Sequence, residues 1–300
     1  MSYTSPLFLM YFSEGYSFRH IWTILGQIEV VTMVVSPETI KISYSDDNAC
    51  WNHLIVIDTD ELSDYYYNIY DSDGNLVPDY PVTFNFQDMV QSTKTVGRKD
   101  SLKVSLMPGE HRLNLQPIKD NKELNRTGAL FVNLLLDVEH YFYSSSRVLP
   151  PKPTIRIQSR TFTNICNEIT NMKCSSMEMI ESDDGVVIKG ILPNGKNCAF
   201  QKFRKRLVQR KREEKKLNLN IDYDVLDNYQ TDSLDVGLDL EIVDTNKISL
   251  SKQVVQSLSK LNNLSSGSCN LRIYFFDDGA TITSAIGTSH YGVYYVHIYN

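Results

Sequence analysis

The chain lacks a long apolar run and a secretory signal. No apolar segment approaches the roughly 20 residues of a membrane-spanning helix, and the first residues do not show a charged segment followed by an apolar one. Cysteine is also scarce: the five cysteines form no CxxC pair, and an odd number suits a reducing compartment. We therefore expect a protein of the nucleus or the cytoplasm that is not secreted and has no membrane partner.

The chain also lacks the short motifs of common enzyme chemistry. It has no nucleophile elbow, P-loop, HExxH, zinc-type Cys/His spacing or Gly-rich dinucleotide loop. The paired acids Asp46-Asp47 and Asp183-Asp184 fall in predicted turns, where aspartate is favoured for its bonds to the backbone. We expect no enzyme, no catalytic residue, no cofactor and no metal.

What is present is a globular composition that favours sheet. Apolar residues make up 42% of the chain, charged residues 22%, and there are 18 tyrosines. The net charge of −6 argues mildly against a nucleic-acid binder, but residues 202–216 are mostly basic and 222–244 mostly acidic and polar. The basic run could grip DNA, act as a localisation signal or form a solvated helix, and these alternatives stay open.

Two similar segments suggest a duplicated unit. FRHIWTILGQI (18–28) and FTNICNEITNM (162–172) both place Phe, then Ile three residues later, at the start of one narrow apolar stripe. This spacing is typical of an amphipathic helix, and Cys166 falls on the stripe as a small core residue. In each half, segments that resemble strands follow the helix.

The predicted order is strand, helix, three strands, then strand, helix, three strands, and it occurs twice. Helices are predicted at 17–28 (with Ser17 as N-cap), 87–96, 160–172 and 250–262. Strands are predicted at 7–12, 30–35, 39–44, 51–57, 65–70, 82–86, 101–107, 112–118, 128–136, 154–158, 175–181, 186–192, 198–203, 238–243, 271–276, 281–286 and 293–298. This order predicts an α+β fold of two similar domains, each with two helices packed on antiparallel sheets.

A Ser- and Pro-rich stretch separates the two halves. Three serines at 144–146 precede Pro150, Pro151 and Pro153, and proline resists both helix and sheet. We predict one domain at 1–137, an extended connector at 138–153 and a second domain at 154–300. Residues 204–236 break the strand pattern and are predicted to form a long loop.

The exposed faces of the predicted helices are polar without being acidic, although acidic residues outnumber basic ones 36 to 30. Long donors along a helix suit contacts with phosphates that need no base identity. The alternative for any one helix is a solvated face. The residues predicted to contact DNA are Arg19, His20, Gln91, Lys94, Arg98, Lys99, Arg160, Asn164, Asn167, Asn171, Lys252, Gln256 and Lys260.

At this level the chain resembles a DNA sliding clamp of the proliferating cell nuclear antigen (PCNA) family. The resemblance rests on the order of elements and on FRHIWTIL (18–25), Asp137-Val138-Glu139, Asp184-Gly185-Val186 and Tyr294-Tyr295-Val296. It implies helices that line a hole, sheets outside, and a homotrimer closed head to tail around duplex DNA. The implied function is that of a DNA polymerase processivity factor that tethers replication and repair proteins.

The resemblance also implies two further sites. Strands at 129–136 and 197–203 would join neighbouring subunits, through Ala129, Phe131, Asn133, Leu135, Cys198, Phe200 and Phe203. The polymerase and other partners would insert a short peptide with an aromatic and aliphatic anchor under the connector, and a clamp loader is an implied partner. The implied pocket residues are Tyr44, Ala49, Cys50, Val148, Leu149, Tyr295, Val296 and His297.

Three features depart from the cellular family: the Ser- and Pro-rich connector, the loop at 204–236, and the length of the chain. A divergent clamp of a large DNA virus, working at the replication site in its host cell, would account for them. Two alternatives remain: a monomeric herpes-type processivity factor that binds DNA directly, or a structural protein of repeated antiparallel sheets with no DNA role.

Overall fold

The computed structural model describes residues 5–25, 28–46, 51–119, 130–136, 138, 147–182, 185–204, 231–233, 246–265 and 269–299. For 45, 46, 199, 200, 204 and 231–233 it describes the backbone alone. Predictions that fall on other positions lie outside the described residues. They concern Ala49, Cys50, Ala129, Asp183, Asp184, the strand at 238–243 and most of the loop at 204–236.

In the described part of the chain, each half contains two helices and nine strands. The first half comprises β1 (Phe8–Phe12), α1 (Gly15–Ile24), β2 (Val30–Val35), β3 (Thr39–Asp46), β4 (Trp51–Asp58), β5 (Asp64–Tyr67), β6 (Tyr80–Asn85), α2 (Phe86–Thr93), β7 (Ser101–Leu106), β8 (Arg112–Ile118) and β9 (Leu130–Asn133). The second comprises β10 (Ile155–Gln158), α3 (Ser159–Asn171), β11 (Ser176–Ser182), β12 (Gly185–Ile191), β13 (Asn197–Arg204), β14 (Thr231–Ser233), β15 (Asn246–Ser251), α4 (Lys252–Leu258), the 3₁₀ turn η2 (Leu261–Asn263), β16 (Asn270–Phe276), β17 (Gly279–Ile286) and β18 (Gly292–Tyr299).

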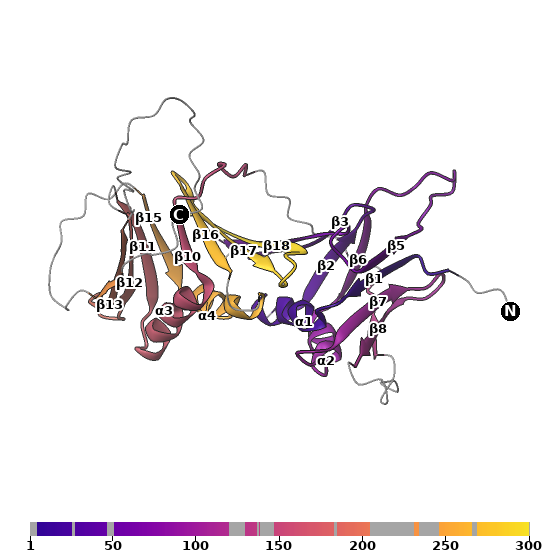
Figure 1. Ribbon diagram of the computed structural model, residues 1–300, viewed down its shortest axis with the longest axis horizontal. Coiled ribbons are helices and arrows are strands. Elements are labelled where there is room, and N and C mark those ends of the chain that lie inside the picture. Colours follow the sequence, from indigo (N-terminus) through magenta and orange to yellow (C-terminus); the bar gives the residue numbers. More distant parts are fainter. Residues whose placement is uncertain are drawn as a thin grey trace, which may run out of the picture.

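The strands form three antiparallel sheets (Figure 1). Their orders are β5-β1-β7-β8-β9, β10-β16-β17-β18-β4-β3-β2-β6 and β14-β13-β12-β11-β15. The run β10-β16-β17-β18 repeats β1-β7-β8-β9, and β15-β11-β12-β13 repeats β6-β2-β3-β4. The central sheet therefore joins the two halves through one strand pair, β18 with β4, from Gly292↔Ile57 to Ile298↔Trp51. The predicted α+β fold of two similar units is confirmed.

The apolar stripes of both repeated helices form the core, as predicted. Phe18, Ile21 and Trp22 of α1 are at most 1% exposed, and Phe162 and Ile169 of α3 at most 2%. Burying each such large apolar side chain contributes about 2 kcal/mol to folding. The stripes hold the helices against the sheets, so their opposite faces are left to solvent.

Several predicted helix boundaries were wrong: α1 ends at Ile24 rather than 28, α2 at Thr93 rather than 96, and α4 at Leu258 rather than 262. Tertiary contacts explain the two differences at the starts of α1 and α4. Helix α1 starts at Gly15 rather than at Ser17, since the Gly15 N–H donates to the Asp100 carbonyl at 3.0 Å and Ser17 is buried inside the first turn. Helix α4 is shorter than predicted, because residues 246–251 form β15, which pairs with β11. The loop predicted at 204–236 also contains a short strand, β14.

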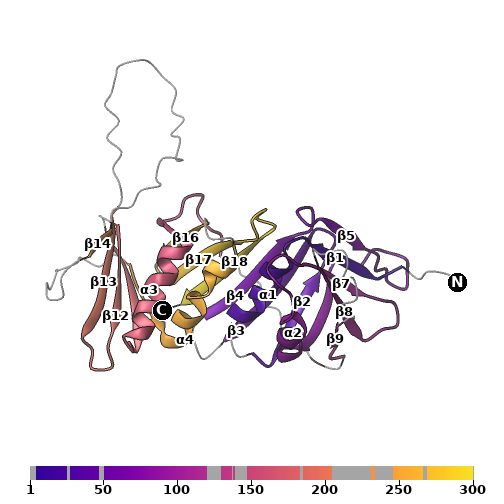
Figure 2. The ribbon, with the colours of Figure 1, turned by 60° about the horizontal axis from the view of Figure 1, so that its bottom comes forward.

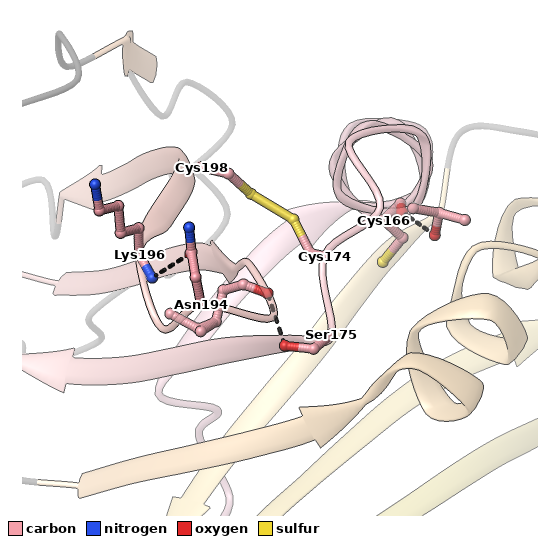
Figure 3. The surroundings of a disulfide bond; sticks show 8 residues. Cys166, Cys174, Ser175, Asn194, Lys196 and Cys198 are labelled. Carbon is pink, nitrogen blue, oxygen red and sulfur yellow. Dashed lines mark hydrogen bonds between the residues drawn. A yellow bond between two sulfur atoms is a disulfide. The ribbon is translucent and has the colours of Figure 1, made fainter.

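A disulfide between Cys174 and Cys198 was not predicted, and the odd cysteine count gave no sign of it (Figure 3). Cys174 follows α3 and Cys198 lies on β13, so only the fold brings them together. The bond crosses β12 at Gly190, where a Cβ atom would lie 2.8 Å from both sulfurs. Cys166 is buried as predicted, and burial raises the pKa of its thiol.

Candidate nucleic-acid interface

The four helices lie side by side in one row along one edge of the molecule, in the order α3, α4, α1, α2, with the sheets behind them (Figures 1 and 2). Contacts between α3 and α4, between α1 and α4, and between α1 and α2 make the row continuous across the two halves. These helices of seven to thirteen residues, each with one buried stripe, thus present a single polar surface, which we call the helix face.

Most of the residues predicted to contact DNA are exposed on this face. Side chains from α2 and the turn after it, from α3 and from α4 are exposed: Gln91, Lys94, Arg98, Lys99, Arg160, Asn164, Asn167, Asn171, Lys252 and Gln256. The exposed acids on the same helices are Asp88 and Glu168. Cations therefore outnumber anions on the helix face of an acidic protein.

His20 was predicted on the exposed face of its helix, and this prediction was wrong. The side chain is only 9% exposed, its Nδ1 lies 3.3 Å from the Thr23 hydroxyl, and its ring stacks edge-on against Tyr16. Burial, and the neighbouring charge of Arg19, lower the pKa of His20 to about 4. A neutral, buried imidazole does not offer a charge to phosphate.

Arg19 and Lys260 were predicted to contact DNA, and in the structure each makes a hydrogen bond within the chain. Arg19 donates from its guanidinium to the Val96 carbonyl at 3.0 Å, and Lys260 donates from Nζ to the Thr23 carbonyl at 2.9 Å. Lys260 also lies beyond the end of α4, which is Leu258. Both residues tie elements of the helix face together.

The turn after α2 holds Arg98 and Lys99 in place through Asp100. The Asp100 carboxylate is buried and accepts hydrogen bonds from Lys119 Nζ at 2.5 Å and from the Gly97 N–H at 2.6 Å. Burial alone would raise the pKa of Asp100, but these hydrogen bonds and the Lys119 charge hold it below its ordinary value. Two exposed cations are thus presented on an ordered turn.

Glu14 was not singled out in the sequence, although it links the two halves beside the helix face. Its carboxylate accepts hydrogen bonds from the Thr288 N–H at 3.0 Å and from the Thr288 hydroxyl. The contact spans the β17–β18 turn of the second half and the start of α1. The two residues are 274 positions apart in the sequence, so no local pattern indicates this contact.

The predicted partner pocket is not brought together as one surface. Strand alternation places Tyr295 and His297 on the face of the central sheet that points away from the helices, and Val296 on the opposite face, where it is fully buried. Tyr44 also packs against the core, 6.4 Å from the Trp51 ring. His297 is only 1% exposed.

The connector side of that pocket is better formed. Val148 is 87% exposed, and Leu149 and Tyr295 are half-buried. Arg147, which was not singled out in the sequence, pairs with Asp278 at 2.7 Å and stacks on the rings of Phe276 and Tyr299 at 4.7 and 4.6 Å. Since those rings lie on the outer face of the central sheet, Arg147 anchors the end of the connector there.

The two predicted subunit strands belong to separate sheets, in which β9 is the edge strand and β13 is next to the edge strand β14. β9 is an edge strand, and it exposes Phe131 and Asn133 while Leu135 beyond it is half-buried. Phe131 is 44% exposed, with the Arg112 guanidinium 4.1 Å from its ring centre. On β13, however, Phe203 is buried and Cys198 is held in the disulfide, and only the backbone of Phe200 is described.

β14 covers part of the β13 edge. It pairs with Gln201, Lys202 and Phe203, so in the described residues 197–200 have no strand on that side.

The described residues contain no group of three or more His, Cys, Asp or Glu side chains that could hold a metal ion. Within the same residues, no helix is long and apolar enough to cross a membrane.

Comparison with solved structures finds proteins of similar fold. The chain superposes on a proliferating cellular nuclear antigen from Entamoeba histolytica with a TM-score of 0.65 and 13% sequence identity, over 98% of this chain and 99% of that one. The chain has the PCNA fold. A PCNA2–PCNA3 complex from Sulfolobus tokodaii matches with a TM-score of 0.64 and 13% identity, over 97% and 98% of the two chains. No family model and no curated protein sequence matches the chain.

Proposed function

We propose that the chain is a DNA sliding clamp. Three copies form a ring that encircles duplex DNA, and the ring tethers a DNA polymerase and other replication and repair proteins through short peptides. The protein acts as a processivity factor and not as an enzyme, and its work needs no sequence preference. The division into domains at 1–137 and 154–300, joined by the connector, belongs to the same proposal.

The observation that carries this proposal is the joint between β18 and β4. In the repeat, β9 is the counterpart of β18, and β13 is the counterpart of β4. β9 and β13 are therefore the counterparts of the two strands that pair in the internal β18–β4 joint, but they lie in different sheets and do not pair with each other within the chain. If β9 of one copy adds to β13 of the next, the contact is heterologous and produces a ring when the rotation closes.

The edges are compatible with such a contact. β9 has four residues, and within the part of the chain that the structure describes, β14 pairs with 201–203 of β13 and no strand pairs with 197–200 on that side. An exposed aromatic on an edge strand, as Phe131 is, is otherwise a liability for aggregation.

A threading experiment tests the ring. The protein is incubated with linear duplex DNA that is tethered to beads at one end. The free end is then blocked, and the beads are washed in about 0.5 M NaCl, where exposed ionic contacts are screened. We expect retention that survives the wash and is lost when the DNA is cut. Protein that washes off equally from blocked and open DNA would contradict the proposal.

A matched pair of variants localises the joint. Phe131→Asp should abolish retention and reduce the mass in light scattering from three chains to one, because a charge would be buried between β9 and β13. Tyr66→Asp is the control, since Tyr66 is 40% exposed on β5, at the opposite edge of the same sheet. It should leave retention and mass unchanged.

A second prediction concerns the helix face. Replacing Lys94 and Lys252 with alanine should weaken equilibrium DNA binding and reduce the slope of log K against log salt by about 2, roughly one for each lost phosphate contact. Replacing Lys103 on β7 and Lys152 in the connector, neither of which lies on a helix, should leave the slope unchanged. If both double variants have equal slopes, the helix face does not contact DNA.

The coverage of β13 by β14 favours one alternative, a monomeric processivity factor that binds DNA directly. That protein would have the mass of one chain. It would also wash off blocked DNA in salt, so the threading experiment separates the two.

A further inference from the structure

A second cluster of cations lies away from the helix face. A cavity of about 380 Å³ opens on the outer face of the central sheet, near the β17–β18 turn. Its polar lining consists of Arg156, Arg272, Asn270, Thr283, Cys269 and His290, and no acidic residue lines it among the described residues. We call it the cationic bay.

Two arginines face each other across this bay. Arg156 on β10 and Arg272 on β16 are direct cross-strand partners, so their Cα atoms lie about 5 Å apart. Their neighbours in sequence, among them Ile157 and Leu271, are buried on the helix side, so both arginines point outward. Like charges directly opposite each other destabilise a sheet.

Nothing described in the chain offsets that repulsion. Within the described residues, neither guanidinium has a hydrogen bond or a carboxylate partner, whereas Arg112 and Arg147 each have one. The lining also includes His290, whose Nε2 lies 3.2 Å from Cys269 Sγ. An anion bound in the bay would relieve the repulsion between the arginines.

The number and type of donors indicate which anion. Each guanidinium presents five N–H donors in a planar fork that matches phosphate oxygens, and the Asn270 amide and Thr283 hydroxyl add more. A carboxylate has only two oxygens to receive them. A phosphomonoester has three terminal oxygens and nearly two negative charges near pH 7.

The position of the bay suggests where such a group comes from. Tyr295, Thr283, Arg272 and Arg156 form one cross-strand row over β18, β17, β16 and β10. The row starts at Tyr295, which belongs to the connector side of the predicted partner pocket, and spans three strand spacings, about 14 Å, or about four extended residues.

We propose that the cationic bay binds a phosphomonoester carried on a phosphorylated serine or threonine of a partner peptide, about four residues from its apolar anchor. The peptide part rests on the proposed clamp function, whereas the binding of the phosphate group does not.

Cys269 provides a local readout. Phenyl phosphate should slow alkylation of Cys269 by iodoacetamide in a saturable manner, as followed by mass spectrometry of the peptide that contains it. Arg156→Gln with Arg272→Gln should weaken this protection at least about tenfold, since charge-assisted hydrogen bonds are lost. Lys103→Gln with Lys196→Gln removes two charges elsewhere and should leave protection unchanged.

Unchanged alkylation in the presence of phenyl phosphate, or equal protection of the wild type and the Arg156/Arg272 variant, overturns the site. The variant should keep or raise its melting temperature without phosphate, because it removes a like-charge pair. A normal melting curve therefore excludes misfolding as the cause of lost protection.

Two synthetic peptides identify the source of the phosphate. Both carry a phenylalanine, with phosphoserine or serine four residues away, and inorganic phosphate serves as the third probe. We expect the phosphopeptide to bind at least about tenfold tighter than its serine counterpart, and to lose this advantage in the Arg156/Arg272 variant. If it binds no tighter than inorganic phosphate, the ligand is a free phosphate and the peptide part is wrong. The threading experiment does not involve the bay, so either proposal can fail alone.

Discussion

Gly279→Ala should lower the free energy of unfolding by about 3 kcal/mol or more. Gly279 has φ +142°, a region that side-chain-bearing residues rarely adopt, and an added Cβ would lie 2.0 Å from the Ile298 carbonyl oxygen. That oxygen belongs to the backbone of β18, so only a shift of the β17–β18 pair would relieve the overlap. Because β18 also carries the joint to β4, the damage should extend to both halves.

Gly195→Ala is the matched control for this prediction. Gly195 also has positive φ, at +80°, but no atom lies within 4 Å of the position of its Cβ. Its replacement should cost about 1 kcal/mol from backbone conformation alone. Urea denaturation of both variants measures the difference, and equal losses would show that the contact with Ile298 is not restrictive.

Acid should weaken the joint between the halves. His53 on β4 is fully buried, and burial, with the charge of His297, lowers its pKa from 6.5 to about 3. Its folded pKa is depressed, so the unfolded chain binds the proton first as pH falls. The contribution of neutral His53 to the free energy of unfolding is complete above pH 6.5 and is lost as pH falls towards 3. At pH 5 about 2 kcal/mol of it is lost for His53 alone.

Urea denaturation at pH 7, 6 and 5, about one unit apart, measures how the free energy of unfolding changes over the range in which His53 affects it. His53→Phe should reduce the dependence of stability on pH. Tyr294→Phe is the control, because it removes the hydrogen bond between Tyr294 and His53 but keeps the imidazole. It should lower stability at pH 7 and keep the slope. If His53→Phe leaves the slope unchanged, the acid sensitivity arises elsewhere, for instance at His297.

Element order was well predicted from periodicity, because each helix and most strands bury one face. β2 and β8 were predicted with their observed bounds, and α3 within one residue. Boundaries shifted where a partner distant in sequence was decisive. Asp100 starts α1 at Gly15, and pairing with β11 extends a strand through 250–251, where the start of a helix was predicted.

The candidate sites were harder to predict than the fold. Lys94, Arg160 and Lys252 were expected on an exposed face and are exposed there, since a helix stripe predicts its own opposite side. His20, Phe203 and Val296 were singled out for contact with partners and are buried. Arg156 and Arg272 were not singled out, because no local signal shows that β10 and β16 are neighbours.

The sequence by itself determined the duplication and the polar outward face of the paired helices, because both depend on side-chain spacing within one element. Which edges stay unmatched, where two arginines meet without a counter-ion, and how Cys174 reaches Cys198 were decided only by tertiary structure. Each of those contacts joins residues from different strands or helices. Local periodicity carries no information about register between elements, and register determines which side chains meet.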